Sequence, residues 1–177
     1  FLPPYRIAVL DEAHMIEGVA SEHLGLRLSH YAFDHWMRRL YVPENGKGLL
    51  HALREGQLAH QVTQLREQVE QLYDDVRKWA RLSEQESQRV VPEPLAIQTP
   101  AMDTLQALTN GLRALAEKTT DEDVKAELNA ARQHGSEMKD MLESFLGQSL
   151  EDQVYWVERE GRRRQQTVLY SAPIEVA

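Results

Sequence analysis

Two adjacent carboxylates, Asp11 and Glu12, are the residues of this sequence best suited to chemistry, and His14 follows them closely. They come directly after residues 7–10, an unbroken apolar run typical of a strand that is covered on both faces. The carboxyl end of such a strand is where open α/β sheets bind ligands. Because one carboxylate can hold Mg²⁺ while its neighbour activates a water, the arrangement suits the hydrolysis of a nucleoside triphosphate.

The tetrapeptide Asp-Glu-Ala-His at residues 11–14 resembles the Walker B box, or motif II, of superfamily 2 helicases. The segment that follows it, residues 15–25, and the Leu-Pro-Pro-Tyr segment at residues 2–5 are similar to the DinG-type branch, whose relatives include XPD. A Pro/Asn/Gly-rich turn at residues 43–48, followed by Gly-Leu-Leu, also matches that branch. A coincidental match would leave Asp11 as a simple helix cap, with Glu12 and His14 in a solvated first turn.

The resemblance implies a role for each residue of the motif. Asp11 would bind Mg²⁺, Glu12 would contact the nucleotide and activate the hydrolytic water, and His14 would couple the triphosphate state to the neighbouring motor domain. The full-length parent would be an ATP-dependent DNA helicase that moves 5′ to 3′ along single-stranded DNA in replication-linked repair. Its helical arch would guide the strand over the motor.

The sequence contains no phosphate-binding loop of the form Gly-x-x-x-x-Gly-Lys-Ser/Thr. A Walker B box without that loop cannot hold ATP, so we expect this chain alone to be inactive. Because it starts without methionine and ends at Val176-Ala177, we interpret it as an internal piece of a larger enzyme, which supplies the remaining motor domains. Some DinG-type helicases carry a four-cysteine iron–sulfur cluster upstream of motif II, but this chain has no cysteine to ligate one.

Composition limits the other classes of function. The formal net charge of −8 argues against a general nucleic-acid surface, so any DNA contact must be local. No apolar run approaches the roughly 20 residues that span a bilayer. The first residues, Phe-Leu-Pro-Pro-Tyr, have neither the basic start nor the small-residue cleavage site of a signal peptide. We therefore expect no membrane partner and a cytoplasmic location of the bacterial type.

Apolar side chains recur in alternating steps of three and four residues along three segments, which predicts three long helices. We also expect a helix after the acid pair up to residue 24, a second at residues 30–41 and an interruption of the first long helix near Gly56. Thr119 with Glu122, or Thr120 with Asp123, could cap the last helix, and Gly147 should end it. The three sets are residues 58, 62, 65, 69, 72, 76 and 79; 102, 105, 108, 112 and 115; and 124, 128, 131, 135, 138, 142 and 145.

The fold class that follows is mainly α, an antiparallel helical bundle that could fold alone and that resembles the arch insertion of the DinG-type family. Two β-rich runs, residues 154–158 and 167–171, predict a hairpin. We expect this hairpin and the N-terminal Walker B strand to form a small β element. The predicted divisions are residues 1–14 for the motor strand, 15–150 for the arch, and 151–177 for the hairpin that returns to the motor domain.

The hairpin tip carries Arg162, Arg163 and Arg164, which could contact a DNA phosphate, and Trp156 or Tyr155 could stack on a base. The alternative is a solvated turn beside strand residues that pack on the motor domain. The remaining histidines lack the spacing of paired metal ligands, so we interpret them as ordinary surface or core residues.

A second reading belongs to a different class of function. The chain could be a non-enzymatic helical interaction domain in which the Asp-Glu-Ala-His run is coincidental and the acidic surface binds a protein partner. A phosphate-binding loop upstream in the gene, and a Ser-Ala-Thr box downstream, would distinguish the helicase from this alternative.

Overall fold

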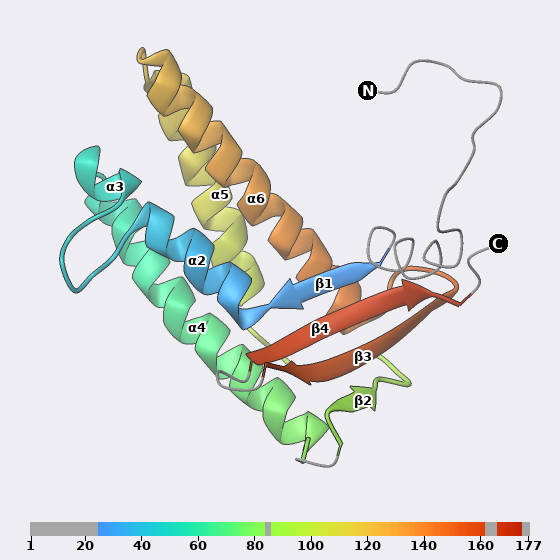
Figure 1. Ribbon diagram of the computed structural model, residues 1–177. Helices are drawn as coiled ribbons and strands as arrows, with labels where there is room; N and C mark the ends of the chain where they lie inside the picture. The colour runs from blue at the N-terminus through green and yellow to red at the C-terminus, as the bar shows by residue number, and fades with distance from the viewer. Residues whose placement is uncertain (1–24, 84–85, 162–165, 175–177) are drawn as a thin grey trace, which may run out of the picture.

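The computed structural model describes residues 25–83, 86–161 and 166–174, which are mainly helical and carry one four-stranded antiparallel sheet (Figure 1). The predicted fold class is confirmed at this level. The elements in chain order are β1 (Leu26–Ser29), α2 (His30–Leu40), α3 (Leu49–Ala52), α4 (Gly56–Ala80), β2 (Gln88–Val90), α5 (Ala101–Lys118), α6 (Glu122–Gly147), β3 (Gln153–Glu160) and β4 (Gln166–Pro173).

The sheet has the strand order β1-β4-β3-β2. Strands β3 and β4 form the predicted hairpin, and their pairing runs from Gln153 opposite Pro173 to Glu160 opposite Gln166. The outer strands differ from the prediction, because β1 and β2 occupy the two sides of the hairpin. Both strands lie outside the two β-rich runs from which the hairpin was predicted. The predicted Walker B strand at residues 7–10 lies outside the described residues.

The helix starts and stops follow local backbone chemistry. The Ser29 hydroxyl accepts a hydrogen bond from the backbone N–H of Ala32 at 3.1 Å and so caps α2. The start of α6 corrects the prediction, because Asp121 accepts from the N–H groups of Asp123 and Val124 while Thr119 belongs to the end of α5. The end of α6 agrees with the prediction, because Gly147 is its last residue, and Gln148 after it takes the left-handed conformation, at φ 48°.

The three predicted apolar stripes face one shared core. Most of their members are completely buried, and Trp79, Met102, Leu115, Val124 and Ala131 are only partly buried at its margin. The expected interruption near Gly56 is the break between α3 and α4. The helices therefore bury the faces that the period of three and four residues predicted.

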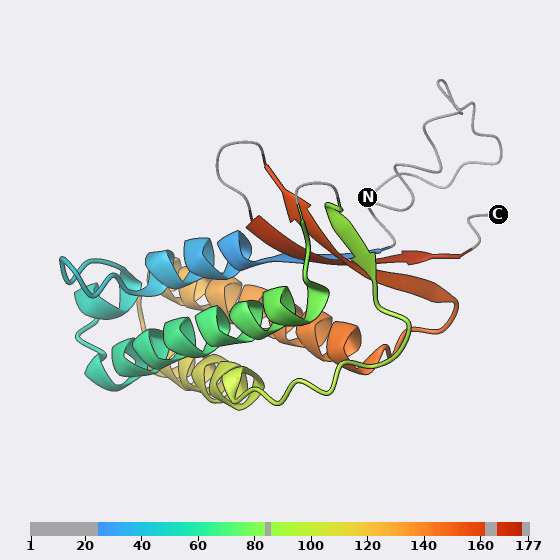
Figure 2. The same ribbon diagram turned by 90° about the horizontal axis from the view of Figure 1, so that it is seen from below.

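Helices α4, α5 and α6 lie on one side of the sheet, as Figure 2 shows, and no described helix covers the other side. The inner face of the sheet belongs to the same core as the helices, because Tyr155, Val157 and Leu169 are buried there. The Tyr155 ring meets Phe145 of α6 edge to face at 5.9 Å. The Tyr73 hydroxyl of α4 donates to the carbonyl of Leu28 in β1 at 2.9 Å, which ties α4 to that strand.

The described chain starts and ends at neighbouring points. Leu26, the first residue of β1, pairs with Ser171 near the end of β4. The two strands are antiparallel neighbours, so residues 25 and 174 lie at the same end of the sheet (Figure 1). Helices α5 and α6 meet far from this corner, at a short connection that includes Asp121.

Candidate functional site

The residues predicted to carry the chemistry fall largely outside the described part of the chain. Asp11, Glu12 and His14 precede residue 25, and residues 162–164, the three arginines of the hairpin tip, lie in the gap between β3 and β4. Their predicted roles with ATP, Mg²⁺ and DNA stay predictions. Trp156 is the predicted site residue that lies within the described part of the chain.

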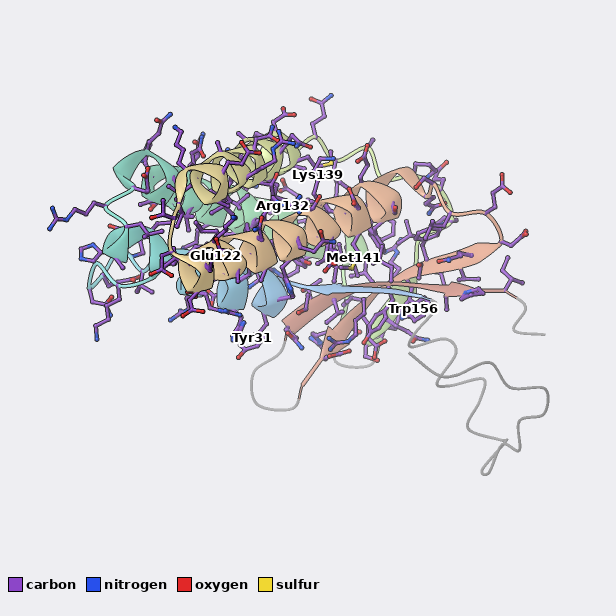
Figure 3. The ribbon with its side chains drawn as sticks, turned by 90° about the horizontal axis from the view of Figure 1, so that it is seen from above. Tyr31, Glu122, Arg132, Lys139, Met141 and Trp156 are labelled. Carbon is purple, nitrogen blue, oxygen red and sulfur yellow. The ribbon has the colours of Figure 1, made fainter. Side chains whose placement is uncertain are left out.

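Trp156 lies on β3 and faces the side of the sheet opposite to α6 (Figure 3). Its ring stacks on Tyr170 of β4 with centroids 5.0 Å apart and an interplanar angle of 8°. Its Nε1 donates to Glu158 Oε2 at 3.1 Å, and Val90 of β2 is its cross-strand neighbour on the other side. Because Tyr170 covers one face of the indole, a nucleic-acid base could stack only on the opposite face.

Tyr155, the other aromatic residue considered for base stacking, points the opposite way. Its side chain is buried at 3% exposure against the helices, and its hydroxyl accepts a hydrogen bond from the backbone N–H of Leu150 at 3.0 Å. The interpretation of Tyr155 as a base-stacking residue is therefore wrong. Side chains alternate along a strand, so only one of two successive aromatic residues can reach the outer face.

Beside Trp156, the outer face carries a hydrogen-bonded cluster that joins three strands. Arg27 of β1 donates to the Tyr170 hydroxyl at 2.9 Å and to Glu160 Oε2 at 2.7 Å. The Tyr170 hydroxyl itself donates to Glu160 Oε1, and Gln166 Nε2 donates to Glu160 Oε2 at 3.2 Å. The Arg27 guanidinium also lies 5.8 Å from the centre of the Tyr170 ring, within reach of a cation–π attraction.

Electrostatics in this cluster favour a fixed ion pair. Burial would raise the pKa of the Glu160 carboxyl, but the hydrogen bonds from Tyr170 and Arg27 outweigh it and hold that pKa below its ordinary value. Burial and the hydrogen bond to Glu160 raise the pKa of the Tyr170 hydroxyl. An ionised carboxylate with this many donors is a poor general base, so the cluster is better suited to holding strands together than to catalysis.

The outer face becomes apolar toward the end of the sheet where the described chain starts and stops. Val90 is 56% exposed and Val154 40% exposed, both on the same face as Trp156, and Ile174 beyond the end of β4 is 63% exposed. Few large hydrophobic side chains among the described residues are as exposed as these. This apolar face was not predicted from the sequence, although the alternation of apolar residues at positions 154 and 156 and at 170 and 172 indicates it.

Two clefts lie in the helical part of the molecule. The first, of about 460 Å³, lies around α3 and the start of α4 and is lined by residues that include His51, Arg54 and His60. The second, of about 150 Å³, lies between α2 and α6 beside Trp36 and His134. Thr63 also lines the first cleft, and its hydroxyl donates to the backbone carbonyl of Ala59 at 3.2 Å.

Among residues 25–83, 86–161 and 166–174, no group of three or more histidine and carboxylate side chains is arranged to hold a metal ion. The helices in these ranges also include none with the length and apolar character needed to cross a bilayer.

Comparison with known proteins identifies no relative of this chain. A scan against known protein families finds no match for this chain, and a search of curated protein sequences finds none either. The class that the structure itself defines is a mainly α domain whose helices cover one face of a four-stranded antiparallel sheet.

Proposed function

We propose that this chain is the part of a DinG-type, ATP-dependent DNA helicase that runs from motif II through the arch insertion toward motif III. Residues 11–14 would serve the ATPase of the motor, and the described residues would form the arch, an antiparallel helical bundle built on a small sheet. We assign the hairpin of β3 and β4 to this arch and not to the motor domain, because its inner face belongs to the core of the helices. The single-stranded DNA and the remaining motor domains would be its partners.

The observation that carries the proposal is the adjacency of the two ends of the described region. A domain inserted into a loop of another domain must leave that loop close to where it entered, so its ends have to be neighbours. Leu26 and Ser171 meet this requirement, because they pair directly across β1 and β4. An insertion between motif II and motif III requires the same geometry.

The dimensions also support an arch. Helix α4 has 25 residues and α6 has 26, which at about 1.5 Å per residue gives elements nearly 40 Å long. Their far ends lie well away from the corner at which the described chain starts and ends (Figure 1). An insertion of this shape could extend over a bound strand while its base stays fixed to the motor.

The first test is made in the full-length protein and concerns chemistry. The variant Glu12→Gln should keep ATP binding nearly intact and lower DNA-stimulated ATP hydrolysis by at least about 100-fold, the loss expected for a positioned general base. Single-turnover hydrolysis with labelled ATP measures this effect. Hydrolysis close to that of the unmodified protein would overturn the role of Glu12.

The second test concerns the insertion. Replacing residues 26–173 of the full-length protein with a short Gly/Ser linker should leave ATP hydrolysis within a few fold and abolish the unwinding of a 5′-tailed duplex. A short linker suffices because the ends are neighbours. Loss of the motor fold in this deletion, seen by circular dichroism and ATP binding, would contradict the insertion and favour the non-enzymatic interaction domain.

A further inference from the structure

The face of the sheet that no described helix covers carries more apolar side chains than is usual for a sheet face next to solvent. Val90, Val154, Trp156 and Tyr170 form adjacent cross-strand positions on this face, and Ile174 extends it past β4. Leaving such side chains in water forfeits roughly 25 cal/mol for each Å² of apolar area that a partner could cover. An apolar patch of this kind is typical of a docking surface.

We propose that residues 13–24 of this chain dock across this face as an amphipathic helix, so that the sheet is covered on both sides. The apolar side chains Met15, Ile16 and Val19 would meet the outer face, and Glu17 would stay in water. This docking concerns the chain's own packing and does not depend on the helicase assignment.

Three observations select this occupant. In a helix over residues 13–24, Val19 follows Met15 by four residues and Ile16 by three, so the three side chains share one side and Glu17 lies on the other. Gly25 alone joins the segment to β1, and so short a linker gives the segment a high effective concentration at the sheet. Gly25 is the residue type best able to turn the chain after a helix.

The third observation is a match of lengths. Twelve helical residues extend about 18 Å, and four strands at about 4.8 Å spacing are about 14 Å wide. A helix that starts beside β1, at one edge of the sheet, can therefore cross β4 and β3 and reach Val90 on β2. A longer reach would need more chain than this segment has.

The absence of cysteine allows a direct test on the whole 177-residue chain. In the double variant Val19→Cys and Val154→Cys the two thiols would face each other, and mild oxidation should form an intramolecular disulfide. The matched control Glu17→Cys with Val154→Cys moves the first thiol to the opposite side of the helix. We expect the control to react about tenfold more slowly, because docking raises the local concentration for one pair only.

Hydrogen exchange supplies a second measurement. Val154→Glu should speed the exchange of the backbone amides of residues 13–24 by at least about tenfold, because a buried charge disfavours docking. Leu150→Glu is the matched control, because Leu150 is also 40% exposed but lies between α6 and β3, away from the face. We expect no change at residues 13–24 in this control.

Three results would overturn the proposal. Equal oxidation rates for the two cysteine pairs would show that the segment has no preferred side toward the sheet. Unchanged exchange of residues 13–24 in Val154→Glu would show that they do not cover it. A dimer of the unmodified chain in sedimentation, converted to a monomer by Val154→Glu, would assign the face to a second copy.

Discussion

Gly135 shows how strictly a single position can be determined by its neighbours. A Cβ atom placed there would lie 2.6 Å from Cζ2 of Trp36, whose Nε1 donates to the carbonyl of Ala131 at 3.0 Å. The indole is held by that hydrogen bond, so it cannot move aside freely. Gly135 belongs to the third predicted set of buried positions, but the periodic pattern does not explain why it is a glycine. The reason is the close approach between α2 and α6, which a periodic pattern cannot indicate.

We expect Gly135→Ala to destabilise the chain by about 1–3 kcal/mol, the usual cost of overpacking a closed core. Helix propensity alone would predict a gain of nearly 1 kcal/mol for the same change. Urea denaturation followed by circular dichroism measures the difference. The control is Gly147→Ala in the same helix, where a Cβ would meet nothing within 4 Å, and its stability should not fall.

Glu160 gives a prediction for the dependence of stability on pH. Its pKa is lowered in the folded chain, so its contribution is fully present above the ordinary value for glutamate, about 4.3, and is lost as the pH falls through the lowered value. Glu160→Gln should therefore reduce stability at pH 7 by about 0.5–1 kcal/mol, as for a partly exposed ion pair. Toward pH 3 the difference between the two chains should shrink. A constant difference from pH 7 to pH 3 in thermal melts would argue against the ion pair with Arg27.

At the scale of elements, the residue that caps the start of α6 differs from the residues that the sequence pattern predicted. The sequence offered capping boxes beginning at Thr119 or Thr120, while in the structure Asp121 is the residue whose carboxylate accepts the two free N–H groups. We expect Asp121→Ala to cost about 1 kcal/mol and Thr120→Ala to cost little. Equilibrium denaturation of the two variants decides between them, and an equal loss in both would contradict the observed cap.

The helices were predictable to within a few residues, because a period of three and four with flanking breakers reflects burial on one side. Strands β1 and β2 were harder to assign, since each is short and pairs with residues more than sixty positions away in the sequence. No local pattern encodes such a pairing. The cluster of Arg27, Glu160 and Tyr170 was missed for the same reason, because its members come together only once β1 has paired with β4.

At the scale of the whole molecule, the sheet and the helices depend on each other. The sequence suggested that the helices could fold without the hairpin. In the structure, Tyr155 and Val157 of β3 and Leu169 of β4 are buried in the core that the helices share. Each such side chain contributes roughly 2 kcal/mol on burial, so the three together contribute roughly 6 kcal/mol, as much as the lower end of the 5–15 kcal/mol net stability of an ordinary domain.

A chain that ends at residue 150 should therefore lose cooperative folding, while a chain that ends at residue 174 should keep it. The shorter chain should retain helical circular dichroism, because its helices have their own caps and apolar stripes, but its thermal transition should be broad. It should also bind a hydrophobic dye, since Phe145 would lose Tyr155 as its covering ring. A sharp transition and dispersed methyl signals in the shorter chain would show instead that the helices are a domain by themselves, as the sequence alone suggested.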